Sequence, residues 1–169
     1  MKNRYSAKIE GEIAKALGRD LPISKKHSVE ICRWIRKKKL EKAKLMLNKV
    51  LEKEIAVPYK RHISDLGHKK GAKGPGRYPI KACKEILKLL ESAETNAQFK
   101  GMNTGNLIIE HINAQQASRP WHFGRQRRRK MKRAHVEIIL KESRKGKKEE
   151  KKKTEKPRTK KETEGSEKK

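Results

Sequence analysis

Cysteine is nearly absent from this chain of 169 residues, which contains only Cys32 and Cys83. Neither belongs to a Cys-x-x-Cys pair, so the spacing typical of zinc sites is missing. Both fall on the apolar faces of expected helices, where free cysteines usually behave as small buried hydrophobic residues. We therefore expect two reduced core thiols and no metal site.

Long hydrophobic runs are missing as well. No apolar stretch approaches the roughly 18 residues that a membrane span requires. Residues 1–5 are followed by mixed polar sequence and not by the apolar segment of a signal peptide. These absences favour a cytoplasmic protein with no membrane partner.

The groupings of side chains that support catalysis are also lacking. The 20 Asp and Glu residues are scattered, without an Asp-x-Asp or His-x-x-x-His array, and no serine or cysteine nucleophile signature is present. Gly71 to Gly76 has the glycine spacing of a phosphate-binding loop, but Arg77-Tyr78 follows where such a loop has Lys-Ser or Lys-Thr. We therefore expect a protein that is not an enzyme and binds no cofactor.

Positive charge dominates what is present. The 48 Lys and Arg residues give a formal net charge of +28, and charged residues make up 40% of the chain against 33% hydrophobic ones. Average soluble domains are nearer 25% charged and 45–50% apolar. Because a compact domain with this charge would repel itself, the composition indicates a phosphate-rich partner that neutralises it.

Hydrophobic periodicity predicts a mixture of helices and strands. The expected helices cover 25–38, 41–54 and 80–100. The expected strands cover 106–116 and 134–141, with a short additional strand over 14–21. Only the root of the hairpin formed by 106–141 is expected to join the core, because Asn113, Gln115 and Gln116 further out are polar on both faces. Trp34 on the first helix is expected to be core or partly exposed.

Two basic segments lie between these elements. The run 36–39 ends the first expected helix and suits either a solvated helix C-terminus or a phosphate contact. Residues 56–79 are expected to form one long irregular loop, with four glycines and Asp65 as its only acid. Loops of this length are usually functional or disordered, and this composition is typical of a loop that becomes ordered on RNA.

The most informative segment is 117–133, where eight of seventeen residues are Lys or Arg and none is acidic. Its like charges repel, which favours a hairpin tip that needs a polyanion around it. Arginine and lysine pair with phosphate oxygens, and Trp121, His122 and Phe123 can stack on unpaired bases. Packing of Trp121 onto the return strand is the alternative. Folded RNA is favoured over duplex DNA, because no helix-turn-helix, zinc-finger or zipper signature is present.

Residues 143–169 form a separate, low-complexity end. They contain thirteen Lys or Arg and six Glu, a net charge of +7, and no apolar residue except Pro157. A segment of this composition cannot bury enough apolar surface to fold. We expect a disordered basic tail.

A specific combination of motifs is spread over residues 14–141. It comprises Gly-Arg-Asp-Leu-Pro-Ile-Ser (18–24), Lys-His-Ser-Val-Glu-Ile-Cys-Arg (26–33), Val-Pro-Tyr-Lys-Arg-His (57–62), Gly-Arg-Tyr-Pro-Ile-Lys-Ala (76–82), Leu-Leu-Glu-Ser-Ala-Glu-Thr-Asn-Ala-Gln-Phe-Lys-Gly-Met (89–102), Ile-Glu-His-Ile (109–112) and His-Val-Glu-Ile-Ile-Leu (135–140). Together these stretches resemble a universal family of large-subunit ribosomal proteins. It is number twenty-two in the universal series, seventeen in the older eukaryotic series, and the match is to its archaeal and eukaryotic branch.

The resemblance implies an α+β fold, with a three-stranded antiparallel sheet packed against about three helices and a long protruding β-hairpin. It also implies an RNA-binding domain over 1–142, made of a body (1–105) and an extended hairpin (106–141), followed by the disordered tail (143–169). In this family the body sits near the outer mouth of the peptide exit tunnel. The hairpin runs inward through ribosomal RNA, and its tip lines the tunnel.

The basic loop, the hairpin and the matching stretches together give the expected contact residues. Ribosomal RNA contacts are expected at Arg19, Lys25, Lys26, Lys60, Arg61, His62, Lys69, Lys70, Lys73, Arg77, Arg125, Arg127, Arg128, Arg129, Lys130, Lys132 and Arg133. The tunnel tip is expected at Arg119, Pro120, Trp121, His122, Phe123 and Gly124. After Arg125 the run Gln-Arg-Arg-Arg-Lys-Met-Lys-Arg (126–133) departs from the family's less charged pattern, which favours a phosphate-bound return segment there.

The resemblance implies a structural constituent of the large ribosomal subunit that supports its assembly in the cytoplasm. The implied partners are large-subunit ribosomal RNA, neighbouring ribosomal proteins and, transiently, the nascent chain. No homo-oligomer is expected. The alternative is a basic chromatin or nucleoid protein that binds duplex DNA.

Overall fold

A computed structural model describes residues 5–69, 71–72 and 74–143 of the chain. In chain order the elements are β1 (Ile13–Leu21), α1 (Lys25–Ile35), α2 (Leu40–Leu51), β2 (Val57–Pro58), β3 (Gly76–Arg77), α3 (Ile80–Phe99), the 3₁₀ turn η1 (Thr104–Asn106), β4 (Leu107–Gln116), the 3₁₀ turn η2 (Gly124–Gln126) and β5 (Ala134–Glu142). The expected α+β class, with a three-stranded antiparallel sheet and helices, is confirmed. The expectations for Lys70, Lys73 and the tail beyond residue 143 lie outside the described residues.

The last strand of the chain occupies the centre of the sheet. β5 pairs antiparallel with β1 on one side and with β4 on the other. All five residues from Val136 to Leu140 are buried, as befits a strand that is paired along both edges and covered on both faces. The β4–β5 pairing continues outward as far as Gln116 opposite Ala134.

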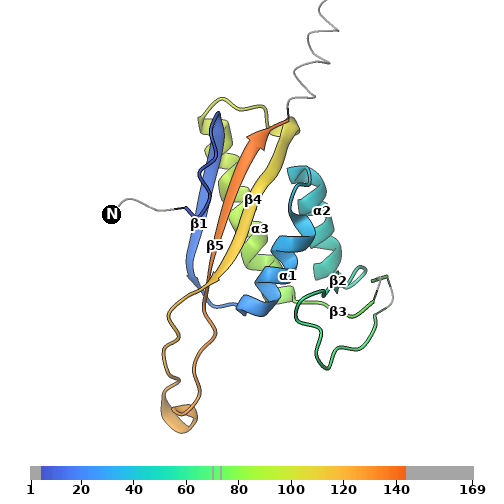
Figure 1. The fold of residues 1–169 in the computed structure, drawn as a ribbon, viewed down its shortest axis with the longest axis vertical. Helices are drawn as coiled ribbons and strands as arrows, with labels where there is room; N and C mark the ends of the chain where they lie inside the picture. Colours follow the sequence, from blue (N-terminus) through green and yellow to red (C-terminus); the bar gives the residue numbers. More distant parts are fainter. Residues whose placement is uncertain (1–4, 70, 73, 144–169) are drawn as a thin grey trace, which may run out of the picture.

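The expectation that only the root of the hairpin joins the core is wrong. Ala114, Ala117 and Ala134 are all buried at the outer end of the two strands. The polar residues that suggested a solvated hairpin alternate with small apolar ones, and β1 adds a third strand that makes the packed face wider. The sheet therefore supports the hairpin up to residue 116 (Figure 1).

The N-terminal segment crosses the face of the sheet opposite the helices. Ser6 donates a hydrogen bond from its backbone N–H to Glu137 Oε2 at 3.0 Å and a second from its hydroxyl to Oε1. His111 Nε2 lies 3.0 Å from the same Glu137 Oε1. These partners explain how a carboxylate on the central strand is only 4% exposed, because burying an unpaired charge would be costly.

Helix α1 ends three residues earlier than periodicity predicts. Instead of completing a turn, residues 37–39 run beside the outer edge of β4. The N–H of Lys37 donates to the carbonyl of Ile109 at 2.9 Å, and the N–H of Ile109 donates to the carbonyl of Lys38 at 3.0 Å. The otherwise unpaired edge of β4 gains hydrogen bonds in this way. Lys37 has φ +62°, which breaks the helical backbone at that position.

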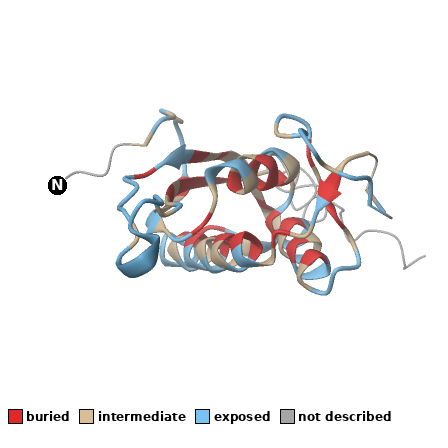
Figure 2. Cartoon of the chain, turned by 90° about the horizontal axis from the view of Figure 1, so that it is seen from below, coloured by how far each residue is buried: buried red, intermediate tan, exposed pale blue. Residues whose placement is uncertain are grey.

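Helix α3 covers the other face of the sheet, with α2 packed beside it (Figure 1). Its buried stripe repeats at helical spacing through Cys83, Ile86, Leu90, Ala93 and Ala97. The helix ends before Gly101, which has φ +69°, the left-handed conformation expected of a glycine at that position. In Figure 2 the buried stretches of the chain (red) lie mainly where the sheet and the helices meet.

The segment 56–79 is not wholly irregular. Its ends are joined by the short pair β2–β3, with Val57 opposite Arg77 and Pro58 opposite Gly76. A further bridge joins His68 to Pro75. The buried Gly76 lies against Val57 and Ala56, where a Cβ atom would come within 3.2 Å of both. The two ends of the loop are therefore held together against the core.

None of the helices among the described residues combines the length and the apolar character that a membrane span needs.

Candidate RNA-binding surface

Residues 117–133, called the extension below, project beyond the sheet from the ends of β4 and β5 (Figure 1). The extension is a hairpin with sparse main-chain pairing. Its two sides are joined by hydrogen bonds from Ala117 N–H to Arg133 O (3.2 Å), from Met131 N–H to Pro120 O (2.8 Å) and from His122 N–H to Arg129 O (2.8 Å). Such spacing leaves most main-chain and side-chain groups facing solvent. The hairpin geometry thus presents its basic residues outward.

The sequence left open whether Trp121 packs onto the return strand or stacks on a base, and its geometry is compatible with both. Its backbone pairs with Lys130 across the extension, and the Lys130 ammonium lies 4.6 Å from the indole centroid. The side chain is nevertheless 58% exposed. A cation over one face of the ring fixes the indole while leaving surface for a partner. The geometry therefore suits stacking on a base.

The far end of the extension is a single turn. Gly124 has φ +64° and begins the 3₁₀ turn η2, which reverses the chain. Phe123 is 86% exposed just before it. Arg125, Arg127 and Arg128 follow in or beside the turn and are exposed. An exposed aromatic ring beside three guanidinium groups is typical of surfaces that bind single-stranded nucleic acid.

The neck of the extension is tied to the end of β1. Arg133 Nη1 donates to the backbone carbonyl of Asp20 at 3.1 Å, and the backbone N–H of Asp20 donates to His135 Nδ1 at 3.1 Å. Asp20 has φ +50°, and the β1–β5 register shifts between Gly18 and Leu21. This irregular turn gives the extension a second anchor besides its own strands.

The basic turn 60–62 is held by a buried acid. Glu30, on α1, is only 1% exposed. Its carboxylate accepts hydrogen bonds from the backbone N–H groups of Lys60 (3.1 Å), Arg61 (2.8 Å) and His62 (2.9 Å). Burial alone would raise the pKa of Glu30, but these donors and the charge of His62 outweigh it, and the pKa is lowered from 4.5. The side chains of Lys60 and Arg61 are left exposed.

The other expected contact residues are distributed over three regions. Arg19 on β1, Lys25 and Lys26 in the first turn of α1, and Lys69 and Arg77 in the 56–79 loop are all exposed. Figure 1 shows that this loop and the extension lie apart, on different sides of the first turn of α1. The expected residues therefore follow an extended surface and do not form one compact patch.

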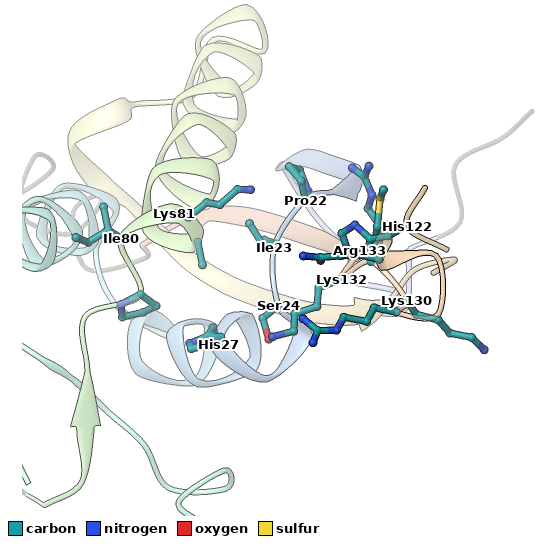
Figure 3. A pocket seen from close by; sticks show the side chains of 15 residues that line it. Pro22, Ile23, Ser24, His27, Ile80, Lys81, His122, Lys130, Lys132 and Arg133 are labelled. Carbon is teal, nitrogen blue, oxygen red and sulfur yellow. The ribbon is translucent and has the colours of Figure 1, made fainter. Parts of the chain in front are cut away.

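Where the extension returns to the body it forms a groove with the starts of α1 and α3 (Figure 3). The cavity measures about 720 Å³. Lys81, His27, Gln126 and Met131 line it, and sequence reasoning assigned none of them a contact. Lys81 offered a signal, since it is a basic residue in the first turn of a helix that follows a proline.

His27 in this groove is held by a buried tyrosine. Its Nδ1 lies 2.5 Å from the hydroxyl of Tyr59, and the two rings meet edge to face. Burial and then the charges of Arg77, Lys132 and His62 lower the pKa of His27 from 6.5. Burial also raises the pKa of Tyr59. The imidazole is therefore mainly neutral at neutral pH, and it lies in a positive field that reaches it from the extension.

Metal ligands do not gather anywhere in the described residues: no group of three or more His, Cys, Asp or Glu side chains is placed to hold an ion there. Cys32 and Cys83 are buried and unpaired, as expected for core thiols. What the surface offers is cations, exposed aromatic rings and backbone donors, which are the groups that bind phosphates and bases.

A family model described as ribosomal protein L22p/L17e matches residues 16–141. The chain belongs to this family. The large ribosomal subunit protein uL22 of Methanococcus aeolicus is 46% identical over 136 residues, covering 76% of this chain and 89% of that protein. The uL22 protein of Archaeoglobus fulgidus is 42% identical over 142 residues, covering 80% of this chain and 92% of that protein.

A third relative extends further along the chain. The uL22 protein of Methanosphaera stadtmanae is 44% identical over 151 residues, covering 84% of this chain and 98% of that protein. The L22p/L17e family is structural and not enzymatic, which confirms the expectation that the chain is not an enzyme. The resemblance read from the motifs is likewise confirmed. Nothing in the comparisons supports the DNA-binding alternative.

Proposed function

We propose that this chain is a structural constituent of the large ribosomal subunit and acts in the cytoplasm as part of the ribosome. It binds ribosomal RNA and neighbouring ribosomal proteins and supports subunit assembly. Family membership supports this proposal, and so does a net charge of +28 on a chain whose sequence lacks clustered catalytic groups. Neutralisation of phosphates is the physical basis of the binding.

One observation supports an RNA partner most directly. The acid-free extension carries eight cations and is anchored only at its neck, by strands that end at Gln116 and Ala134 and by Arg133 on Asp20. Trp121 and Phe123 are exposed on it. A free protein gains nothing by exposing these rings among repelling charges, whereas folded RNA supplies both phosphates and unpaired bases.

The proposed contact residues fall into two groups, those that bind phosphates and those at the tip of the extension. Phosphate contacts belong to the cations of β1, α1, the 56–79 loop and the return side of the extension. These are Arg19, Lys25, Lys26, Lys60, Arg61, Lys69, Arg77, Arg125, Arg127, Arg128, Arg129, Lys130, Lys132 and Arg133, all exposed except the half-buried Arg133. His62 joins them, and we include Lys70 and Lys73 on charge alone.

The tip, 119–124, is proposed as the part that lines the peptide exit tunnel and meets the nascent chain. Its support is that it leads into the turn at the far end of a long projection and carries two exposed aromatic rings. We further propose that residues 1–142 act as one RNA-binding unit, with 1–105 as the body and 106–141 as the hairpin, and that the chain forms no homo-oligomer.

Sedimentation tests the assignment. Native protein in a moderate-salt gradient should travel with large subunits, survive DNase treatment and be released by RNase. Release by DNase but not by RNase would instead indicate a chromatin or nucleoid protein and overturn the proposal. Migration as a free protein in the presence of intact subunits would overturn it equally.

A further inference from the structure

The groove between the extension and the body has two walls that are distant in the sequence. One wall is formed by the starts of α1 and α3, and the other by His122, Gln126 and residues 129–133 of the extension. Figure 3 shows Lys81 on the α3 side, with His122, Lys132 and Arg133 on the opposite side and Ile23 between them. The cavity of about 720 Å³ falls within the range of roughly 300–1,000 Å³ that is usual for small-molecule sites.

The floor of the groove is apolar. Ile23 is 2% exposed and Ala82 is 4% exposed, and Ile80 and Met131 are partly buried beside them. A site for a phosphate alone has no use for such a floor, because an anion is best held by donors and water. A flat, largely apolar ring does gain from burial against it.

The rim of the groove is cationic. Lys81, Arg129 and Lys132 come from both walls and are all exposed at its edge. No Asp or Glu lines the groove. The charge of Lys132 contributes to lowering the pKa of His27 on the facing wall. Phosphates are therefore attracted to the rim while the floor accepts an uncharged ring.

We propose that this groove holds a single unpaired nucleotide of the large-subunit RNA, with its base on the apolar floor and its flanking phosphates on the rim. The inference rests on the proposed function, because it takes the RNA partner as given. The inference adds that the body and the extension contact the same nucleotide from opposite sides. Unpaired bases in RNA are the elements that proteins recognise by stacking and by contacts to base edges.

A duplex does not fit this site. An A-form helix presents its phosphates and 2′-hydroxyls on a convex surface and keeps its bases stacked inside. It would leave the floor at Ile23 empty and contact only the rim. An extruded base fills the floor and brings two phosphates to the rim together.

A pair of charge-matched variants tests the proposal. The groove variant is Lys81→Gln/Arg129→Gln/Lys132→Gln, and the control variant, Arg125→Gln/Arg127→Gln/Arg128→Gln, removes three charges outside this groove. Each should reduce the dependence of log affinity on log salt by about two to three, since each lost phosphate contact contributes roughly 0.7–0.9. Charge loss alone therefore does not separate them.

Base accessibility separates the two variants. With full-length protein at saturation on large-subunit RNA, dimethyl sulfate should fail to modify at least one base that is unpaired and reactive in the free RNA. The control variant should keep this protection, and the groove variant should lose it while protections elsewhere remain. Retention of the base protection by the groove variant, or its loss in the control variant, would overturn the nucleotide assignment.

A single thiol locates that base. Cys32 and Cys83 are buried, so Gln126→Cys supplies one accessible thiol at the groove for a short photo-crosslinker. In assembled subunits it should crosslink to the nucleotide whose base is protected. Crosslinking to another protein, or to paired RNA, would overturn the proposal. If wild-type protein protected no base and bound no large-subunit RNA, the proposed function itself would fail, which is a different result.

Discussion

Glu30 Oε1 accepts a hydrogen bond from the backbone N–H of His62 at 2.9 Å and another from Arg61 at 2.8 Å. The only carboxylate buried on α1 thus points into the backbone of a basic turn and away from the basic side chains around it. The acid fixes the direction in which Lys60 and Arg61 are displayed. We therefore propose Glu30 as a positioning residue for RNA binding.

Replacing this carboxylate should destabilise the protein and weaken RNA binding together. In Glu30→Gln the amide keeps one acceptor but turns an N–H₂ group toward a backbone donor. We expect a loss of about 1–3 kcal/mol in the free energy of unfolding, measured by chemical denaturation, because a buried donor is left unsatisfied. The control Glu91→Gln removes the same charge from an exposed position on α3 and should leave stability within about 0.5 kcal/mol of wild type. Equal effects of both changes would argue against positioning.

The same residue predicts a pH dependence. The pKa of Glu30 is lowered from 4.5 in the folded protein, so its contribution to stability is complete above that value and is lost as the pH falls through the folded pKa. The difference in unfolding free energy between wild type and Glu30→Gln should be constant from about pH 7 to pH 5 and then shrink. A difference that grows on acidification would contradict the lowered pKa.

Exposed aromatic rings on the extension should matter only when RNA is bound. Phe123→Ala has a matched control in Phe99→Ala, because both rings are 86% exposed but Phe99 ends α3. Neither change should alter the melting temperature. The first should weaken binding to a large-subunit RNA fragment roughly 5- to 150-fold, the equivalent of one stacked base, and the second should not. Trp121→Ala should resemble Phe123→Ala.

Removing the extension should leave the body folded. Gln116 and Ala134 are already paired, so residues 117–133 can be replaced by Asn-Gly, a sequence that favours a two-residue hairpin turn. Circular dichroism should show a cooperative transition near that of wild type. Binding to large-subunit RNA should lose up to about seven units of salt dependence, from eight lost cations. An unfolded body would mean that the extension is part of the core.

The two native thiols should be nearly unreactive in the folded protein. Burial raises the pKa of both Cys32 and Cys83 to about 12, so the thiolate fraction at pH 8 falls by roughly a thousandfold relative to an exposed cysteine. A thiol reagent should label neither residue until denaturant is added. Gln126→Cys should react at once under the same conditions, and rapid labelling of the wild type would contradict the burial.

Local patterns predicted the elements whose burial repeats along one segment. The stripe of α3, the two hairpin strands and the short strand β1 all follow from their own periodicity. The end of α1 did not, because it is decided by hydrogen bonds between the backbones of residues 37–38 and Ile109, which lies more than seventy residues away. Hydrophobic periodicity within one segment cannot reveal a contact with a distant one.

In the candidate site, too, some features could be predicted from local sequence and others depend on contacts between distant segments. Composition identified the cations of the extension, since charge is visible residue by residue. The burial of Glu30 and the approach of His27 to Tyr59 depend on how α1 meets the 56–79 loop. The groove depends on three segments that meet only after folding. Its one local signal was Lys81 after a proline.

The pairing of Ile13 with Lys141 has a consequence for timing. During synthesis, β1, the helices and the whole extension are made before β5 exists, so the sheet closes last. Because such non-local pairing forms slowly, pulsed hydrogen exchange during refolding should protect the amides of β1 late. The extension is complete as a polycation while the body is still open. The topology therefore predicts that the extension is available to RNA before the sheet has closed.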